Sequence, residues 1–211
     1  MADELSALIQ NNRVWAAQHL ARDPEFFRRL SQQQNPEYLW IGCSDSRVPA
    51  NDIVGLAPGE LFVHRNVGNL VYHTDFNCMS VLQYAIEVLR VKHIIVTGHY
   101  GCGGVRAALQ NREMGLIDNW LRDVRDIYDR NRTRLELLGE EARIDRLCEL
   151  NVVQQVANVC YTTIVQRAWH QGQKLSVHGC IYSINDGILR DLGVQVTGPE
   201  QLAPIYRILE G

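Results

Sequence analysis

Residues 93–104, with the sequence HIIVTGHYGCGG, decide the fold of this chain of 211 residues. Residues 93–98 form a short run rich in β-branched side chains, which is typical of a buried strand. His99 and Cys102, two common metal ligands, follow directly, and a predicted helix begins after Gly103-Gly104. We therefore expect a strand whose end delivers metal-binding side chains to the start of a helix.

The residues before this stretch predict a helix and two more strands. Thr74 or Asp75 can cap a helix whose apolar residues share one face, namely Met79, Leu82, Ile86 and Leu89. Residues 38–42 and 61–65 are short apolar runs, which predict buried strands. A strand, a helix and a strand in this order predict a parallel pair with a right-handed crossover.

The rest of the chain predicts further helices and two strands. Helical sequence continues after Gly104 to about Trp169, with an apolar stripe formed by Leu147, Leu150, Val153, Val156 and Cys160. Residues 174–180 predict a fourth strand, and residues 194–196 predict an edge strand. The predicted fold class is α/β, with a mainly parallel four-stranded sheet, an antiparallel edge strand and flanking helices.

We expect a single domain over residues 1–211, because the chain shows no linker, repeat or low-complexity tract. Residues 1–35 are predicted to form an N-terminal helical arm. Asp23 and Pro24 open its second helix, and apolar residues recur at helical spacing in the first, namely Leu5, Leu8, Ile9, Val14, Trp15 and Leu20. An apolar face that the domain itself cannot cover predicts a partner.

The composition is that of a soluble globular protein, with 46% hydrophobic residues, 21% charged residues and a net charge of −3. It does not favour nucleic-acid binding, because no basic run is interleaved with aromatic residues. The Arg-rich residues 122–134 are interrupted by Asp123, Asp126 and Asp129, which predicts a solvated helix with mixed charges.

The N-terminal residues show no secretory signal, and no segment is apolar enough to predict a membrane span. We therefore expect a cytoplasmic protein with no membrane partner. Six cysteines in such a chain favour metal binding or quiet burial over disulfides. Four of them are expected to be packing residues: Cys78, Cys148, Cys160 and Cys180.

A metal site is predicted where two strands end. Cys43 closes the strand at residues 38–42, and His99 closes the strand at residues 93–98. Since the carboxyl ends of parallel strands meet at one edge of a sheet, these residues and Cys102 can come together. Two thiolates and an imidazole suit Zn²⁺ and leave one position open. Water at an open position has its pKa lowered from about 15.7 toward about 7, which yields a nucleophile near neutral pH.

The alternative at this point is a closed structural zinc site made of Cys43, Asp45, His99 and Cys102. Structural sites usually take their ligands from paired Cys-x-x-Cys loops, and this chain has none. Arg47, which follows Asp45, is also not needed in a purely structural site, so the pair favours catalysis. The spacing of Cys102 and Arg106 does not fit a cysteine phosphatase, and the glycines at 101, 103 and 104 do not match a dinucleotide-binding turn.

The segments Cys43-Ser44-Asp45-Ser46-Arg47 and His99-Tyr100-Gly101-Cys102 together resemble the signature of the β-class carbonic anhydrases. The likeness covers roughly residues 5–205. Residues 37–42 and 62–66 extend this likeness, and residues 147–152 and 176–179 also resemble the bacterial branch. Trp40, Arg65 and Tyr182 are similar to residues of its bicarbonate-regulated second subtype, type II.

The resemblance implies the reversible hydration of CO₂ to bicarbonate and a proton. It implies one Zn²⁺ per chain held by Cys43, His99 and Cys102, with Asp45 and Arg47 as the catalytic dyad. Asp45 would orient the attacking hydroxide, and Arg47 would hold Asp45 ionised. In the second subtype Asp45 can instead become the fourth metal ligand, which gives an inactive state that is favoured at low pH.

The same resemblance implies an allosteric bicarbonate pocket formed by Trp40, Arg65 and Tyr182. It also implies a homodimer in which the N-terminal helices pack on the partner subunit, with dimers paired into a homotetramer. Two rival functions remain open. One is hydrolysis of a CO₂-like molecule such as carbonyl sulfide or carbon disulfide, and the other is a zinc-bearing bicarbonate sensor with little turnover.

Overall fold

The computed structural model describes residues 2–32, 34–45, 47–110 and 112–208, which divide between two compact units, 1–35 and 36–211. The first unit contains α1 (Ala2–Arg22) and α2 (Phe26–Gln32). Trp15 and Phe27 hold the two helices together, with ring centroids 5.5 Å apart, and His19 stacks on Phe26 at 4.4 Å. Leu5 and Leu8 of α1 are 61% and 64% exposed, so this helix carries an uncovered apolar face.

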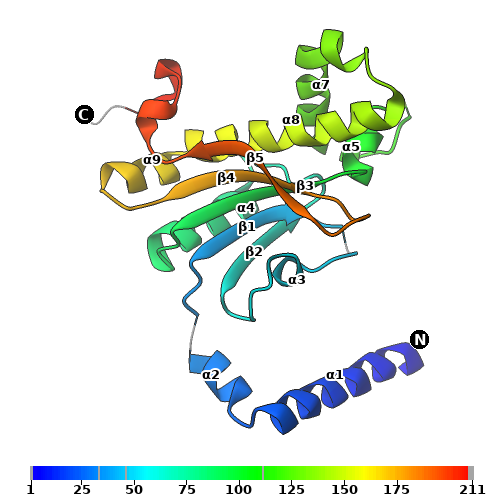
Figure 1. The fold of residues 1–211 in the computed structure, drawn as a ribbon, viewed down its shortest axis with the longest axis vertical. Helices are drawn as coiled ribbons and strands as arrows, with labels where there is room; N and C mark the ends of the chain where they lie inside the picture. The colour runs from blue at the N-terminus through cyan, green and yellow to red at the C-terminus, as the bar shows by residue number, and fades with distance from the viewer. Residues whose placement is uncertain (1, 33, 46, 111, 209–211) are drawn as a thin grey trace. The chain divides into compact units, whose positions relative to one another are not determined.

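The second unit is built on a five-stranded sheet with the order β2-β1-β3-β4-β5 (Figure 1). Its strands are β1 (Tyr38–Cys43), β2 (Leu61–Asn66), β3 (His93–His99), β4 (Ser176–Tyr182) and β5 (Leu189–Val196). The first four are parallel, and β5 is antiparallel to β4. The predicted fold class is therefore confirmed.

Two predicted strand boundaries were wrong. β4 begins at Ser176 rather than at residue 174, and β5 begins at Leu189 rather than at residue 194. The start of β5 has no apolar run, because it contains Arg190, Asp191 and the positive-φ residue Gly193. Pairing with β4 across a bulge extends this edge strand despite its polar sequence.

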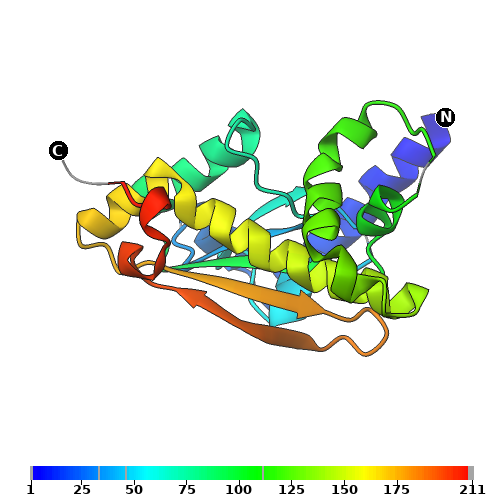
Figure 2. The same cartoon turned by 90° about the horizontal axis from the view of Figure 1, so that it is seen from above.

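One face of the sheet is covered by helices. Leu39, Ile41 and Ile94 are at most 1% exposed on this face. They form one core with α4 (Phe76–Gln83), the π-helical turn η1 (Tyr84–Val88), α8 (Glu140–Tyr161) and α9 (Thr163–His170). Figure 2 shows α8 and α4 lying on the same side of the sheet. Asp75 caps α4 as expected, by accepting a hydrogen bond from the Asn77 N–H at 3.0 Å.

The buried stripe of α8 differs from the prediction at one position. Leu147, Val156 and Cys160 are buried and Leu150 is partly buried, but Val153 is 40% exposed and Val152 is fully buried instead. The reason is that two polar residues of this helix, Asn151 and Gln155, are also buried. They hydrogen-bond to backbone groups of Gly68 and Val71 and so rotate the buried face toward that loop.

The other face of the sheet carries less helix. There α3 (Ala50–Val54) packs against Trp40 and Leu61. Beyond the ends of the strands lie α5 (Gly103–Ala108), α6 (Ile117–Trp120) and α7 (Arg122–Leu135), with the 3-10 turns η2 (Pro199–Gln201) and η3 (Pro204–Tyr206) near the C-terminus. The predicted mixed-charge helix corresponds to α7, whose residues Val124 and Ile127 face the interior.

Cysteine burial agrees with the expectation of packing residues. Cys78, Cys148 and Cys160 are at most 2% exposed, and burial raises the pKa of each thiol to about 12. Cys180 is partly buried. Within the described ranges, no helix is both long enough and apolar enough to cross a bilayer.

Candidate metal centre

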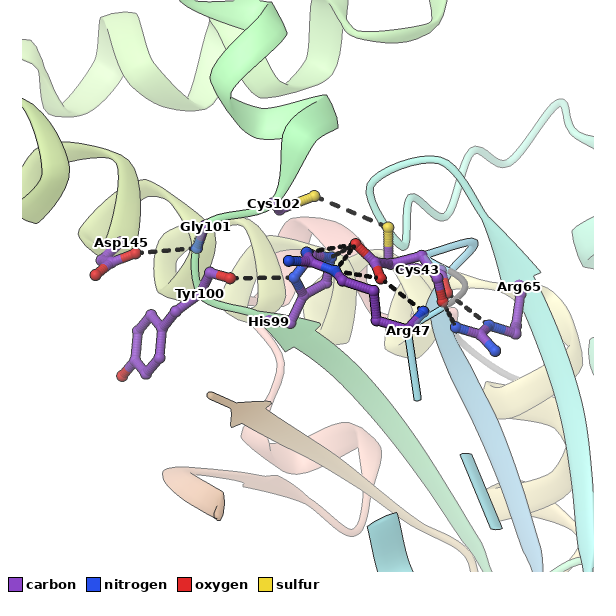
Figure 3. A network of polar contacts seen from close by, with 9 residues as sticks. Cys43, Arg47, Arg65, His99, Tyr100, Gly101, Cys102 and Asp145 are labelled. Carbon is purple, nitrogen blue, oxygen red and sulfur yellow. Dashed lines mark hydrogen bonds and ion pairs between the residues drawn. The ribbon is translucent and has the colours of Figure 1, made fainter. Parts of the chain in front are cut away.

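The three predicted metal ligands come together at the carboxyl edge of the sheet. Cys43 is the last residue of β1, His99 is the last residue of the neighbouring strand β3, and Cys102 is the N-cap of α5. Their ligand atoms all lie within 4.8 Å of one another, and the two Sγ atoms are 3.8 Å apart. All three side chains are buried. Figure 3 shows Cys43, His99 and Cys102 gathered at the ends of their segments.

The two sulfurs form a coupled pair. A hydrogen bond from Cys102 lowers the pKa of Cys43, which is lowered further by hydrogen bonds with the backbone of Gly68 and Asp45. The same interaction raises the pKa of Cys102. The pair therefore holds one proton between two sulfurs, and a divalent cation would displace it because the metal binds thiolates.

The tautomer of His99 follows from its neighbour. Its Nδ1 lies 3.1 Å from the carbonyl oxygen of Tyr100, and a carbonyl only accepts hydrogen bonds. Nδ1 therefore carries the hydrogen, and Nε2 presents a lone pair. Nε2 is buried without a hydrogen-bond partner among the described residues. A buried lone pair beside two sulfurs, with the opposite nitrogen fixed by a backbone carbonyl, fits a Zn²⁺ ion.

The predicted dyad is formed beside these ligands. Arg47 donates from Nε to Oδ1 of Asp45 at 2.8 Å and from Nη2 to Oδ2 at 2.6 Å, and its backbone N–H donates to Oδ1 at 3.0 Å. These hydrogen bonds lower the pKa of Asp45 to about 2 against the opposing effect of burial. Asp45 Oδ2 lies 3.7 Å from His99 Nε2, so an ionised carboxylate borders the donor set.

Arg65 has a contact that the sequence did not predict. Its Nε donates to the carbonyl oxygen of Cys43 at 2.6 Å, and its Nη2 donates to the carbonyl oxygen of Asp45. The guanidinium thus ties down the backbone that carries one metal ligand and the dyad carboxylate. No sequence signal could have shown this, because both acceptors are backbone groups 20 or more residues away along the chain.

The three residues predicted for an anion pocket lie on the sheet face opposite α8. Arg65 is opposite Gly42 in the β1–β2 register, two residues after Trp40, and Tyr182 is opposite His99. Trp40 and Tyr182 are 2% and 4% exposed. Thr97 lies opposite Gly42 on this face, and its buried Oγ1 has no partner within the described ranges. Sequence reasoning did not select Thr97.

A second group of potential ligands, His64, Asp75 and Cys78, also lies within 4.8 Å. Each member has another role: Asn66 Nδ2 lies 3.3 Å from His64 Nε2, Asp75 caps α4, and the Cys78 thiol has its pKa raised to about 12 by burial. This agrees with the expectation that Cys78 is a packing residue.

Comparison with known proteins gives the family. Residues 38–189 match the family described as "Carbonic anhydrase". A carbonic anhydrase of Emericella nidulans is 44% identical over 206 residues, which cover 97% of this chain and 90% of that protein. The structure of a Coccomyxa β-carbonic anhydrase in complex with acetazolamide superposes with a TM-score of 0.88 at 46% identity, covering 93% of this chain and 89% of that one. The chain belongs to the β-class carbonic anhydrase family.

The predicted enzyme class, a carbonic anhydrase, is thus confirmed. A structure described as a tetrameric β-carbonic anhydrase from Sordaria macrospora is also similar, with a TM-score of 0.87 and 35% identity over 92% of this chain and all of that one. These relatives are not bacterial, so they do not single out the bacterial type II branch, which stays a prediction.

The sulfur pair predicts redox sensitivity in the absence of metal. Because a thiolate and a thiol lie 3.8 Å apart, mild oxidation of zinc-free protein should join Cys43 and Cys102 in a disulfide. Zinc loading should prevent it, since both sulfurs would then be ligands. Peptide mapping by mass spectrometry checks this, with Cys160, a buried thiol of the core, as the internal control. Equal oxidation of Cys43 with and without zinc would contradict the prediction.

Proposed function

We propose that this protein catalyses the zinc-dependent reversible hydration of CO₂ to bicarbonate and a proton. The observation that carries the proposal is the buried Cys43–His99–Cys102 donor set bordered by an Arg-paired carboxylate, in a chain of this family. These three residues would hold one Zn²⁺ per chain. Bound there, Zn²⁺ lowers the pKa of a water ligand toward about 7 and so supplies a nucleophile near neutral pH.

Asp45 would orient that nucleophile. With its pKa at about 2, the carboxylate is ionised throughout the neutral range and can only accept hydrogen bonds. Arg47 hydrogen-bonds to the carboxylate, and the Oδ2 atom of Asp45 also lies near Nε2 of His99. Asp45 is therefore placed to accept a hydrogen bond from the nucleophile and so to direct the nucleophile's lone pair at CO₂.

We propose in addition that Asp45 switches the enzyme off by turning onto the metal as a fourth ligand. Its proximity to His99 Nε2, at 3.7 Å, supports this, because the ion pair with Arg47 directs the carboxylate elsewhere. Hydroxide competes better with the carboxylate as pH rises. Activity should therefore increase with pH, although Asp45 itself does not titrate in this range.

Bicarbonate is proposed to favour the inactive state from a pocket formed by Trp40, Arg65 and Tyr182, as in the type II branch. The three residues share one sheet face, and the buried hydroxyl of Thr97 on that face has no partner among the described residues, which supports a polar ligand there. The route to the metal would be Arg65, since an anion that engages its guanidinium competes with the carbonyls of Cys43 and Asp45.

We also propose a cytoplasmic homodimer, paired into a homotetramer, in which α1 packs on a partner subunit. The exposed Leu5 and Leu8 and the tetrameric relative from Sordaria macrospora support this.

Sedimentation velocity should give a mass of two or four chains of 24.1 kDa, and Leu8→Asp should shift the distribution to smaller species. A single-chain species at micromolar concentration would contradict it. Subcellular fractionation of the native host tests the compartment.

The activity is tested by stopped-flow CO₂ hydration on zinc-replete protein between about pH 6 and about pH 9, on either side of the neutral point at which zinc activates water. The rate should rise with pH. Cys43→Ser should lose zinc and reduce the rate at least about a hundredfold, because a ligand is missing. Cys160→Ser, which changes a buried thiol in a different core cluster from Cys43 and Cys102, should keep both the zinc and the rate. One zinc per chain without hydration at high pH would defeat the proposal.

The anion pocket is tested by bicarbonate inhibition of Tyr182→Phe. This change removes one donor, so the inhibition constant should rise about fivefold, as expected for a hydrogen bond of about 1 kcal/mol. Tyr84→Phe, on the exposed side of η1, is the matched control. The pocket is wrong if inhibition stays unchanged in both Tyr182→Phe and Arg65→Ala.

A further inference from the structure

A single peptide group connects His99 to a carboxylate of α8. The carbonyl of the Tyr100–Gly101 peptide accepts the hydrogen of His99 Nδ1 at 3.1 Å. The N–H of the same peptide belongs to Gly101 and donates to Asp145 Oδ1 at 3.1 Å. Figure 3 shows these groups in sequence, with Asp145 on the far side of the turn from the sulfurs.

The turn that contains this peptide is held in place from α8. Gly101 has a φ of +64°, a conformation that glycine adopts without strain and that sets the direction of its N–H. One turn after Asp145, Glu149 accepts a hydrogen bond from the Tyr100 hydroxyl at 2.8 Å and is paired with Arg146. Glu149 therefore anchors the side chain of Tyr100, whereas Asp145 contacts the peptide itself.

We propose that Asp145 is a positioning residue of the metal centre, which acts on His99 through the Tyr100–Gly101 peptide. Metal-bound histidines commonly donate their second N–H directly to a carboxylate or to a backbone carbonyl. Here the carbonyl is the direct acceptor, and the carboxylate lies one peptide group further away. The inference rests on the proposed zinc site.

The physical effect has two parts. A carboxylate that accepts the Gly101 N–H polarises the peptide and makes the Tyr100 carbonyl a stronger acceptor, since hydrogen bonds in a chain reinforce one another. A stronger acceptor keeps the hydrogen on Nδ1 and increases the electron density at Nε2. The imidazole then becomes a better and better-oriented metal ligand.

A purely structural role of Asp145 would require only a hydrogen-bond acceptor at this position. If Asp145 only ties the turn to α8, any acceptor at this position would serve, and its charge would not matter. Asp145→Asn separates the two roles, because the amide oxygen can still accept the Gly101 N–H without the negative charge. Glu136→Gln is the matched control, since it removes one charge from an Arg-paired carboxylate at the end of α7.

The experiment measures zinc affinity by competition with a chromophoric chelator and records the Nδ1–H resonance of His99 in zinc-loaded protein. Asp145→Asn should weaken zinc binding about tenfold, as changes beyond the direct ligands do. It should also move the resonance upfield, because the hydrogen bond weakens. Glu136→Gln should change neither quantity, and Asp145→Ala should lose at least as much affinity as Asp145→Asn.

The outcomes are distinguishable from those that test the activity. Wild-type affinity and an unmoved resonance in Asp145→Asn overturn the inference, whatever Asp145→Ala does, while the proposed function stands. A wild-type protein that binds no zinc overturns the proposed function and this inference together.

Discussion

The direct parallel pairing of β1 with β3 is the constraint on which the site depends. The register runs from Tyr38 opposite His93 to Gly42 opposite Thr97, so the two strands end side by side. Cys43 follows immediately after the last pair, and His99 lies two residues beyond it. Because a slip of one residue would turn a strand's side chains to the other face, the buried residues of the sheet also fix the two ligands.

The features that could be predicted from the sequence are those that leave a pattern within a short stretch of the chain. The apolar run before Cys43 and the β-branched run before His99 predict both strands and the edge of the sheet where they end. Cysteine and histidine are common metal ligands, so their side chains can be recognised as candidates from the sequence. The features that were missed depend on distant partners. Arg65 contacts backbone carbonyls, and β5 acquires its length from β4, so neither leaves a local pattern.

Helix α8 links the interior to both ligand segments, and its polar residues explain why its buried face was mispredicted. Asn151 Nδ2 donates to the Gly68 carbonyl at 2.8 Å, and Gln155 Oε1 accepts the Val71 N–H at 2.9 Å. This is the loop whose Gly68 backbone hydrogen-bonds to the Cys43 sulfur. At its other end α8 holds the His99–Cys102 turn through Asp145. An all-apolar stripe would pack equally well but would leave these backbone groups unpaired.

Arg65 and Arg47 hold different parts of the segment that follows β1. Arg65 holds its backbone through the carbonyls of Cys43 and Asp45, whereas Arg47 holds only the Asp45 carboxylate. The side chain of Arg47 is 52% exposed, so its ion pair is the more easily broken of the two interactions. Loss of the Arg47 contact frees the carboxylate to rotate while the backbone, and with it the Cys43 ligand, stays in place. The switch proposed at Asp45 would therefore require no rearrangement of the residues proposed to hold the metal.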